Sequence, residues 1–285
     1  MAERLDFYAA VVGVAGPGWR DPAERLDQAG VLALAAHVMA LFGALPPDAV
    51  RARLGALRVA AASQVRAAAV QDPGQDPGQD PGLRQAGGEV TLITRRPAHA
   101  GFFGVDELRL QFRRFDGRIS DPVQREVFVS GDAVTVLPYD PARDRVLLIE
   151  QLRMGPYGRG DPRPWQLEAI AGRIDPGETP EDCARREAVE EAGLVLGPLE
   201  KVAAYYPSPG AMTEYLYSYL ALCDLPDGSA GVFGLATEAE DIRGHLVDFD
   251  ALMALVAAGE ISNAPLILTA LWLQRERGRL RGGRG

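Results

Sequence analysis

Hydrophobic and polar positions follow different patterns in the two parts of the chain. Residues 1–70 are rich in alanine and leucine, and apolar residues at helical spacing predict helices near 21–44 and 47–68. A Leu-Pro-Pro sequence at 45–47 separates these two helices, because proline cannot continue a helix. From residue 89 onwards, short β-type runs separated by turn residues replace the helical pattern.

The second part of the chain combines many short strands with three helices. Strands are predicted at 89–94, 107–115, 125–128, 133–138, 146–152, 199–206 and 214–222. Helices are predicted at about 180–192, 248–258 and 263–277. Mixed strands with inserted and appended helices indicate an α+β fold, in which helices enclose a mixed sheet, rather than a regular βαβ repeat.

A repeated tetrapeptide marks the boundary between the two parts. The sequence QDPG occurs three times in succession from residue 71, and repeated proline and glycine disfavour both helix and strand. We therefore predict a helical N-terminal extension at 1–70, a Pro/Gly-rich linker at 71–88, a main domain at 89–277 and a flexible tail at 278–285.

Composition and charge narrow the possible partners. The 285 residues are 47% hydrophobic, and the formal charge of −9 repels nucleic acid and anionic membranes, so neither is expected as a partner. The two cysteines, Cys183 and Cys223, form neither a disulfide framework nor a zinc motif. The longest apolar run, 31–45, is too short to span a bilayer, and the start lacks a signal-peptide pattern. We expect a cytoplasmic protein.

The most informative segment, residues 171–194, contains a helix with strong start and stop signals. Thr179 is a good N-cap and Pro180 suits the first helical position, whereas Gly193 favours termination. Within this helix Glu187 and Glu191 lie four residues apart and share one face, with Glu190 beside them.

Such a segment by itself is usually a solvated acidic face. Here the preceding loop GRIDPGE carries two glycines and a proline, and it returns Glu178 and the backbone of Ala171 and Gly172 toward the carboxylates. Hard oxygen ligands on a helix and an adjoining loop suit Mg²⁺ or Mn²⁺. The absence of nearby histidine disfavours zinc.

The same residues resemble a complete Nudix box at 172–194: Gly172, five residues, Glu178, seven residues, then REAVEEAGL from Arg186. The resemblance implies a Nudix α/β/α sandwich that cleaves nucleoside diphosphates linked to another moiety. It also implies that Glu187 and Glu191 are the principal metal ligands, that further oxygens contribute, and that Arg186 orients the carboxylates. The contributing oxygens would come from Glu178, Glu190 and the carbonyl of Ala171.

Over about 89–277 the chain is similar to bacterial ADP-ribose pyrophosphatases. The shared segments are GFF at 101–103, REVF at 125–128, IEQLR at 149–153, PWQLEAIAG at 164–172, SPGAMTE at 208–214 and EAEDIRGHLV at 238–247. The resemblance implies a homodimer that, with Mg²⁺, hydrolyses ADP-ribose to AMP and ribose 5-phosphate. Some relatives of this type have been linked to tellurite resistance.

The flanking segments supply candidate substrate residues. In the resembled family Phe102 and Phe103 would enclose the adenine across the dimer, although aromatic residues at a strand start also fill cores. Arg153 would hold the diphosphate, and an ion pair with Glu150 or Glu168 is the structural alternative. Further positions that resemble substrate contacts are Arg125, Glu126, Ser208, Pro209, Gly210 and Glu214.

An acidic loop at the segment LATEAEDIR supplies the candidate general base. By resemblance Glu238 would deprotonate the attacking water and Glu240 would add a metal contact, whereas acidic surface loops are usually only solvated. Two other functions stay open: hydrolysis of other nucleotide sugars or dinucleotides, and non-catalytic sensing of ADP-ribose. The segment 3–13 resembles part of gamma-glutamylcyclotransferase-like domains, which would imply a fragment without that domain's active site.

Overall fold

The structure is a computed structural model that describes residues 2–12, 26–69, 89–235 and 240–282. The predicted linker at 71–88 and the candidate base Glu238 lie outside the described residues, as do 21–25 and 283–285. The chain forms two units, which are described separately. None of the described helices is long and apolar enough to cross a membrane.

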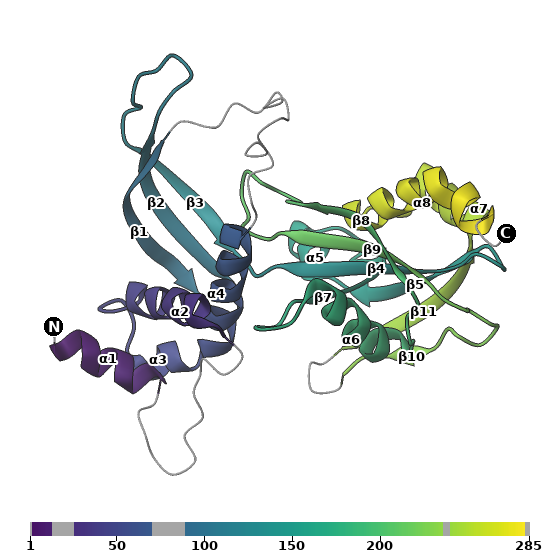
Figure 1. Cartoon of the computed structure of the whole chain (residues 1–285), viewed down its shortest axis with the longest axis horizontal. Helices are drawn as coiled ribbons and strands as arrows, with labels where there is room; N and C mark the ends of the chain where they lie inside the picture. Colours follow the sequence, from purple (N-terminus) through teal and green to yellow (C-terminus); the bar gives the residue numbers. More distant parts are fainter. Residues whose placement is uncertain (1, 13–25, 70–88, 236–239, 283–285) are drawn as a thin grey trace, which may run out of the picture. The chain divides into compact units, whose positions relative to one another are not determined.

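The first unit contains Met1–Asp132, Asp175–Gly177 and Ser208–Glu214. Its described residues form four helices and an antiparallel sheet of order β1-β2-β3 (Figure 1). The helices are α1 (Ala2–Val12), α2 (Gln28–Ala40), α3 (Pro47–Arg51) and α4 (Leu54–Ala69); the strands are β1 (Val90–Ala100), β2 (Gly104–Phe112) and β3 (Val123–Val129).

Local signals explain where these helices begin and end. The side chain of Asp27 accepts a hydrogen bond from the Gly30 N–H and caps the start of α2. The helix predicted at 47–68 is two helices, since α3 ends after Arg51 and α4 begins at Leu54. Arg53, between them, donates to the carbonyl of Ala49 in α3 and so satisfies an acceptor at the break.

The second unit contains Ala133–Ile174, Glu178–Pro207 and Tyr215–Gly285. Its mixed eight-stranded sheet has the order β10-β11-β5-β4-β9-β8, with β6 paired to β5 and β7 paired to β4. The β4–β9 pair is parallel and the other pairs are antiparallel. The strands are β4 (Ala133–Asp140), β5 (Arg145–Leu152), β6 (Trp165–Glu168), β7 (Ile170–Arg173), β8 (Leu199–Tyr205), β9 (Leu216–Leu222), β10 (Val232–Phe233) and β11 (Ile242–Asp248).

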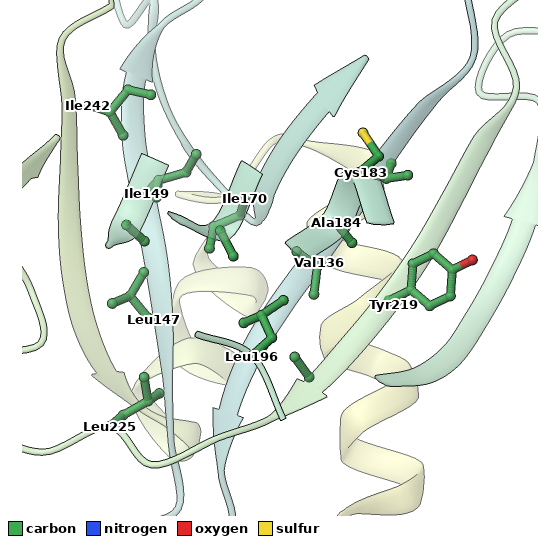
Figure 2. Packing of buried hydrophobic residues seen from close by; sticks show 14 of the residues in the cluster. Val136, Leu147, Ile149, Ile170, Cys183, Ala184, Leu196, Tyr219, Leu225 and Ile242 are labelled. Carbon is green, nitrogen blue, oxygen red and sulfur yellow. The ribbon is translucent and has the colours of Figure 1, made fainter. Parts of the chain in front are cut away.

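Helices cover both faces of this sheet. On one face, α6 (Pro180–Ala192) packs through Cys183 and Ala184 against Val136 and Ile149 of the strands (Figure 2). On the other face, α7 (Phe249–Ala258) and α8 (Ala264–Gly282) pack against Leu137 and Leu148. A short helix, α5 (Met154–Arg159), follows β5. These layers confirm the predicted α+β sandwich with a mixed sheet.

Several elements differ from the sequence prediction. The sequence pattern missed α1, α5, β6, β7, β10 and β11. The last helix continues to Gly282, past the predicted end at 277, because Leu280 is buried and Arg281 pairs with Asp144. Residues 89–132 group with the N-terminal helices rather than with the eight-stranded sheet. The predicted domain boundaries stay a prediction.

Candidate active site

Helix α6 begins and ends where the sequence predicts. The Thr179 hydroxyl accepts a hydrogen bond from the Asp182 N–H at 3.1 Å, and Pro180 occupies the first turn. The helix ends at Gly193, whose φ of 62° is a left-handed conformation that glycine adopts without strain. Both ends of the helix that carries the glutamates are therefore fixed by local chemistry.

Small residues bring α6 close to the sheet. Ala184 and Ala188 are fully buried against the strands, so the glutamates on the adjacent face lie beside β7. Gly172 of β7 is essential for this approach, because a Cβ atom at Gly172 would lie 1.8 Å from Oε1 of Glu187. Glu191 accepts a hydrogen bond from the Ala171 N–H at 2.9 Å.

Four glutamates form what we call the carboxylate cluster: Glu178, Glu187, Glu190 and Glu191. The guanidinium of Arg186 bonds three of them, at 2.9 Å to Glu178 Oε1, 2.7 Å to Glu187 Oε1 and 2.9 Å to Glu190 Oε2. It also donates to the Arg173 carbonyl at 3.0 Å. The predicted orienting contact of Arg186 with the carboxylates is therefore present in the geometry.

The cluster holds more negative charge than Arg186 neutralises. The pKa of Glu187 is raised to about 7, mainly by burial and also by the charges of Glu190 and Glu240, whereas Arg186 opposes the rise. The pKa of Glu191 is raised to about 8, again mainly by burial and also by the charges of Glu187 and Glu240, whereas the hydrogen bond from Ala171 opposes the rise. Burial makes the ionised forms of these glutamates unfavourable, and a bound cation would stabilise those ionised forms.

Glu240 lies close enough to Glu187 and Glu191 for its charge to raise the pKa of both. Its backbone and side chain are fixed by Leu235, whose N–H donates to Glu240 Oε2 at 3.2 Å. Glu240 therefore lies near the carboxylate cluster, and its metal contact stays a prediction. Glu238 lies outside the described residues, and its role as base stays a prediction.

The residues of the cluster fit a hard divalent cation by their chemistry. Carboxylates and a neighbouring backbone carbonyl are the donors that Mg²⁺ and Mn²⁺ prefer. Within the described ranges, no three acidic, histidine or cysteine side chains already meet around one point as metal ligands. Instead the Arg186 guanidinium lies among the carboxylates, where it bonds one oxygen of Glu187 and one oxygen of Glu190.

Arg153 directly follows β5 and forms the ion pair with Glu168 that the sequence leaves open as the structural alternative, while its binding of a diphosphate stays a prediction. Its Nε donates to Glu168 Oε2 at 2.6 Å, and Asn263 also donates to Glu168. The positive charge of Arg153 opposes the rise in the pKa of Glu191. Glu150 is instead paired with His245 at 2.8 Å. The sequence pattern missed Asn263, because a single polar residue before a helix carries no signal of this contact.

The other candidate substrate residues lie in the first unit. Phe102 is 70% exposed and its ring contacts Phe103, which in turn packs on Phe128 of β3. The Phe128 N–H donates to the Ala211 carbonyl, so the loop that holds Ser208, Pro209, Gly210 and Glu214 runs along the same strand. Arg125 and Glu126 are exposed on β3.

The predicted site residues therefore form two groups. The carboxylate cluster, Glu240 and Arg153 come together in the second unit. The phenylalanines, β3 and the loop at 208–214 come together in the first unit. The metal-binding, catalytic and substrate-binding roles of all these residues stay predictions.

Comparisons with known proteins place this geometry in a family. Residues 129–268 match the NUDIX domain. The chain is 42% identical over 186 residues to the ADP-ribose pyrophosphatase of Escherichia coli (strain K12), an alignment that covers 65% of this chain and 88% of that protein.

Two further similarities extend the comparison. The GDP-mannose pyrophosphatase of Escherichia coli (strain K12 / DH10B) is 30% identical over 65% of this chain and 95% of that protein. A crystal structure of an ADP compounds hydrolase matches the fold with a TM-score of 0.53 at 21% identity, and covers 70% of this chain and 100% of that chain. The chain belongs to the NUDIX family, and its sequence is of the type found in the bacterial ADP-ribose pyrophosphatases.

Proposed function

We propose that this Nudix diphosphatase hydrolyses the diphosphate bond of ADP-ribose with Mg²⁺, and releases AMP and ribose 5-phosphate. The main support is the carboxylate cluster beside Gly172, which concentrates buried negative charge in a chain 42% identical to an ADP-ribose pyrophosphatase. A non-catalytic sensor would have no need for such a complete set of carboxylates.

Glu187 and Glu191 would hold the metal, with Glu178, Glu190, Glu240 and the Ala171 carbonyl as further donors. When bound, Mg²⁺ supplies positive charge that polarises the phosphoryl oxygens and activates water for attack. Mn²⁺ would serve the same donors. The Ala171 N–H holds Glu191 in place, which fixes one ligand before the metal arrives.

Two arginines would have distinct roles. Arg186 preorganises the carboxylates and compensates their charge in the free protein. The Nε atom of Arg153 donates to Glu168, and this ion pair holds the guanidinium in place. The two terminal nitrogens of Arg153 would then donate to an anion such as the diphosphate. Glu238 would accept the proton of the attacking water.

In the first unit, Phe102 and Phe103 would bind the adenine by stacking, since Phe102 is exposed beside an aromatic neighbour. Arg125, Glu126 and the loop with Ser208, Pro209, Gly210 and Glu214 would contribute the remaining contacts. We further propose that the active form is a cytoplasmic homodimer, as the resemblance to ADP-ribose pyrophosphatases implies.

The substrate range is tested with a panel of ADP-ribose, GDP-mannose, NADH and diadenosine polyphosphates. We expect fastest turnover of ADP-ribose with Mg²⁺ and none with EDTA. GDP-mannose is the second candidate, because the relative at 30% identity is a GDP-mannose pyrophosphatase. Faster cleavage of GDP-mannose than of ADP-ribose would replace the proposed substrate.

The same assay tests the metal site. We expect Glu191→Gln to lower kcat by at least about 100-fold, because it removes a ligand charge while the amide oxygen still accepts from Ala171. The matched control is Glu181→Gln at the start of α6, whose side chain accepts from the Tyr219 hydroxyl and should leave kcat unchanged. Equal loss in both variants, or full activity of Glu191→Gln, would contradict the assignment.

A further inference from the structure

Gln151 of β5 is a buried polar side chain that neither the fold nor the carboxylate cluster uses. It is 7% exposed, and within the described part of the chain its Nε2 atom has no hydrogen-bond acceptor. A buried donor without an acceptor costs stability, and native structures usually satisfy such groups. An unpartnered amide therefore needs an explanation other than folding.

The strand register shows which way this amide faces. Leu147 and Ile149, four and two residues before Gln151, belong to the core that packs against α6 (Figure 2). Because alternate residues of a strand share a face, Gln151 continues this row toward the end of β5. Glu168 pairs directly with Ile149 in the register and therefore lies on the same face.

Arg153 is the next residue of this row. It follows Gln151 by two positions, in extended backbone with φ −117° and ψ 130°, which places the two side chains roughly 7 Å apart along one face. The ion pair between Arg153 and Glu168 confirms that these side chains share this face. Glu168 lies three residues before Ala171, whose N–H donates to Glu191 at 2.9 Å, so the row ends near the carboxylate cluster.

The acidic side chains near this row accept from other donors and not from Gln151. Arg153 and Asn263 both donate to Glu168, and the Ala171 N–H donates to Glu191. A neutral amide next to a guanidinium, both facing one site, matches an anion with several acceptor oxygens. A diphosphate has such oxygens.

We propose that the Gln151 side-chain amide donates a hydrogen bond to a phosphate oxygen of the bound diphosphate substrate, beside Arg153. This inference rests on the proposed function, since it names a further residue of the same site. The buried amide lowers the stability of the free protein, and its role in substrate binding would explain why it is present. Gln151 is therefore a substrate-positioning residue.

The test compares stability with activity in Gln151→Leu. An apolar residue of similar size removes the unpartnered donor, so we expect Tm to stay the same or rise. We expect kcat/KM for ADP-ribose with Mg²⁺ to fall by about 10- to 100-fold, mainly through KM, because a hydrogen bond to a charged group is lost. In Gln151→Glu, the added negative charge should lower kcat/KM further.

Gln166→Leu is the matched control, since Gln166 lies directly opposite Gln151 on β6. The Gln166 amide donates to the Arg163 carbonyl, and its oxygen accepts from Ser262, so this variant should lose Tm and keep its kcat/KM. Unchanged kcat/KM in Gln151→Leu, or a Tm loss that accounts for its lower activity, would overturn the inference. A wild type that cleaves no diphosphate would instead overturn the proposed function.

Discussion

Two clusters of arginine and acidic side chains in the second unit balance their charges in opposite ways. In the carboxylate cluster one guanidinium, that of Arg186, serves three carboxylates. At the C-terminal helix one carboxylate, that of Asp144, receives Arg277, Arg281 and the Tyr139 hydroxyl. The first cluster has excess negative charge and the second has excess positive charge.

The pKa values of Glu187 and Asp144 shift in opposite directions, in line with this difference in charge. Burial raises the pKa of Glu187 to about 7, despite Arg186. At Asp144 burial also acts upward, but the hydrogen bonds from Arg277 and Tyr139 lower the pKa below its usual value. Asp144 is therefore paired within the chain and holds α8 in place, whereas the function proposed above requires a divalent cation to balance the charges of the carboxylate cluster.

Replacement of Arg186 by alanine should have the largest effect on stability. It leaves three carboxylates without their common cation, and we expect a loss of about 3 kcal/mol in the free energy of unfolding. Because Mg²⁺ can then replace the lost charge, its addition should raise the Tm of Arg186→Ala more than that of the wild type. Thermal unfolding with Mg²⁺ and with EDTA measures both effects.

Arg185→Ala is the control for this prediction. Arg185 precedes Arg186 but donates to the carbonyls of Leu196 and Gly197, so its loss should not increase the response to Mg²⁺. If Mg²⁺ stabilises Arg186→Ala no more than the wild type, the cluster does not accept a cation in place of the guanidinium.

Replacement of Gly172 by alanine should affect activity more than folding. The new Cβ would lie 1.8 Å from Oε1 and 2.4 Å from Cγ of Glu187, so the whole Glu187 side chain has to turn away, at a cost in stability that we expect to be smaller than the loss of activity. We expect kcat to fall by about 10- to 100-fold, because a ligand displaced by about 1 Å no longer shares the site. Gly278→Ala in α8, where the added Cβ meets nothing within 4 Å, should keep full activity. If the Gly172→Ala enzyme has the same kcat as the wild type, the position of Glu187 does not matter for the reaction.

Replacement of Asp144 by asparagine should have the smallest effect. It removes the charge opposite Arg277 and Arg281, at a cost of about 1–2 kcal/mol near pH 7, and asparagine tolerates the φ of 58° at this position. Because folding lowers the pKa of Asp144, its contribution is complete above the ordinary aspartate pKa near 4 and is lost as pH falls through the folded value. The difference from wild type should therefore shrink between pH 5 and pH 3, as equilibrium unfolding would show.

Asp250→Asn is the control for the pH series. Asp250 is 87% exposed and lies 3.6 Å from Arg277, so its replacement should change the free energy of unfolding by less than about 0.5 kcal/mol. A difference between Asp144→Asn and wild type that stays constant down to pH 3 would show that the Asp144 charge does not fasten α8.

The sequence by itself determined the elements whose signals are local. The start of α6 at Thr179 and its end at Gly193 follow from capping chemistry, and the Glu187–Glu191 spacing follows from the helical repeat. Strands such as β5, with a continuous apolar run, were predicted close to their observed limits. Strand β11 was missed, because its polar residues hide the alternation that a buried strand usually shows.

Only the tertiary structure decided which charged side chains, distant in sequence, pair with one another. It showed that Arg153 pairs with Glu168, that Arg186 lies among three carboxylates, and that α8 extends to Gly282 through contacts with Asp144. It also showed that Gln151 is a buried donor without an acceptor among the described residues. The physical reason is that caps and helical spacing depend on neighbours in sequence, whereas burial and charge compensation depend on residues that only strand pairing brings together.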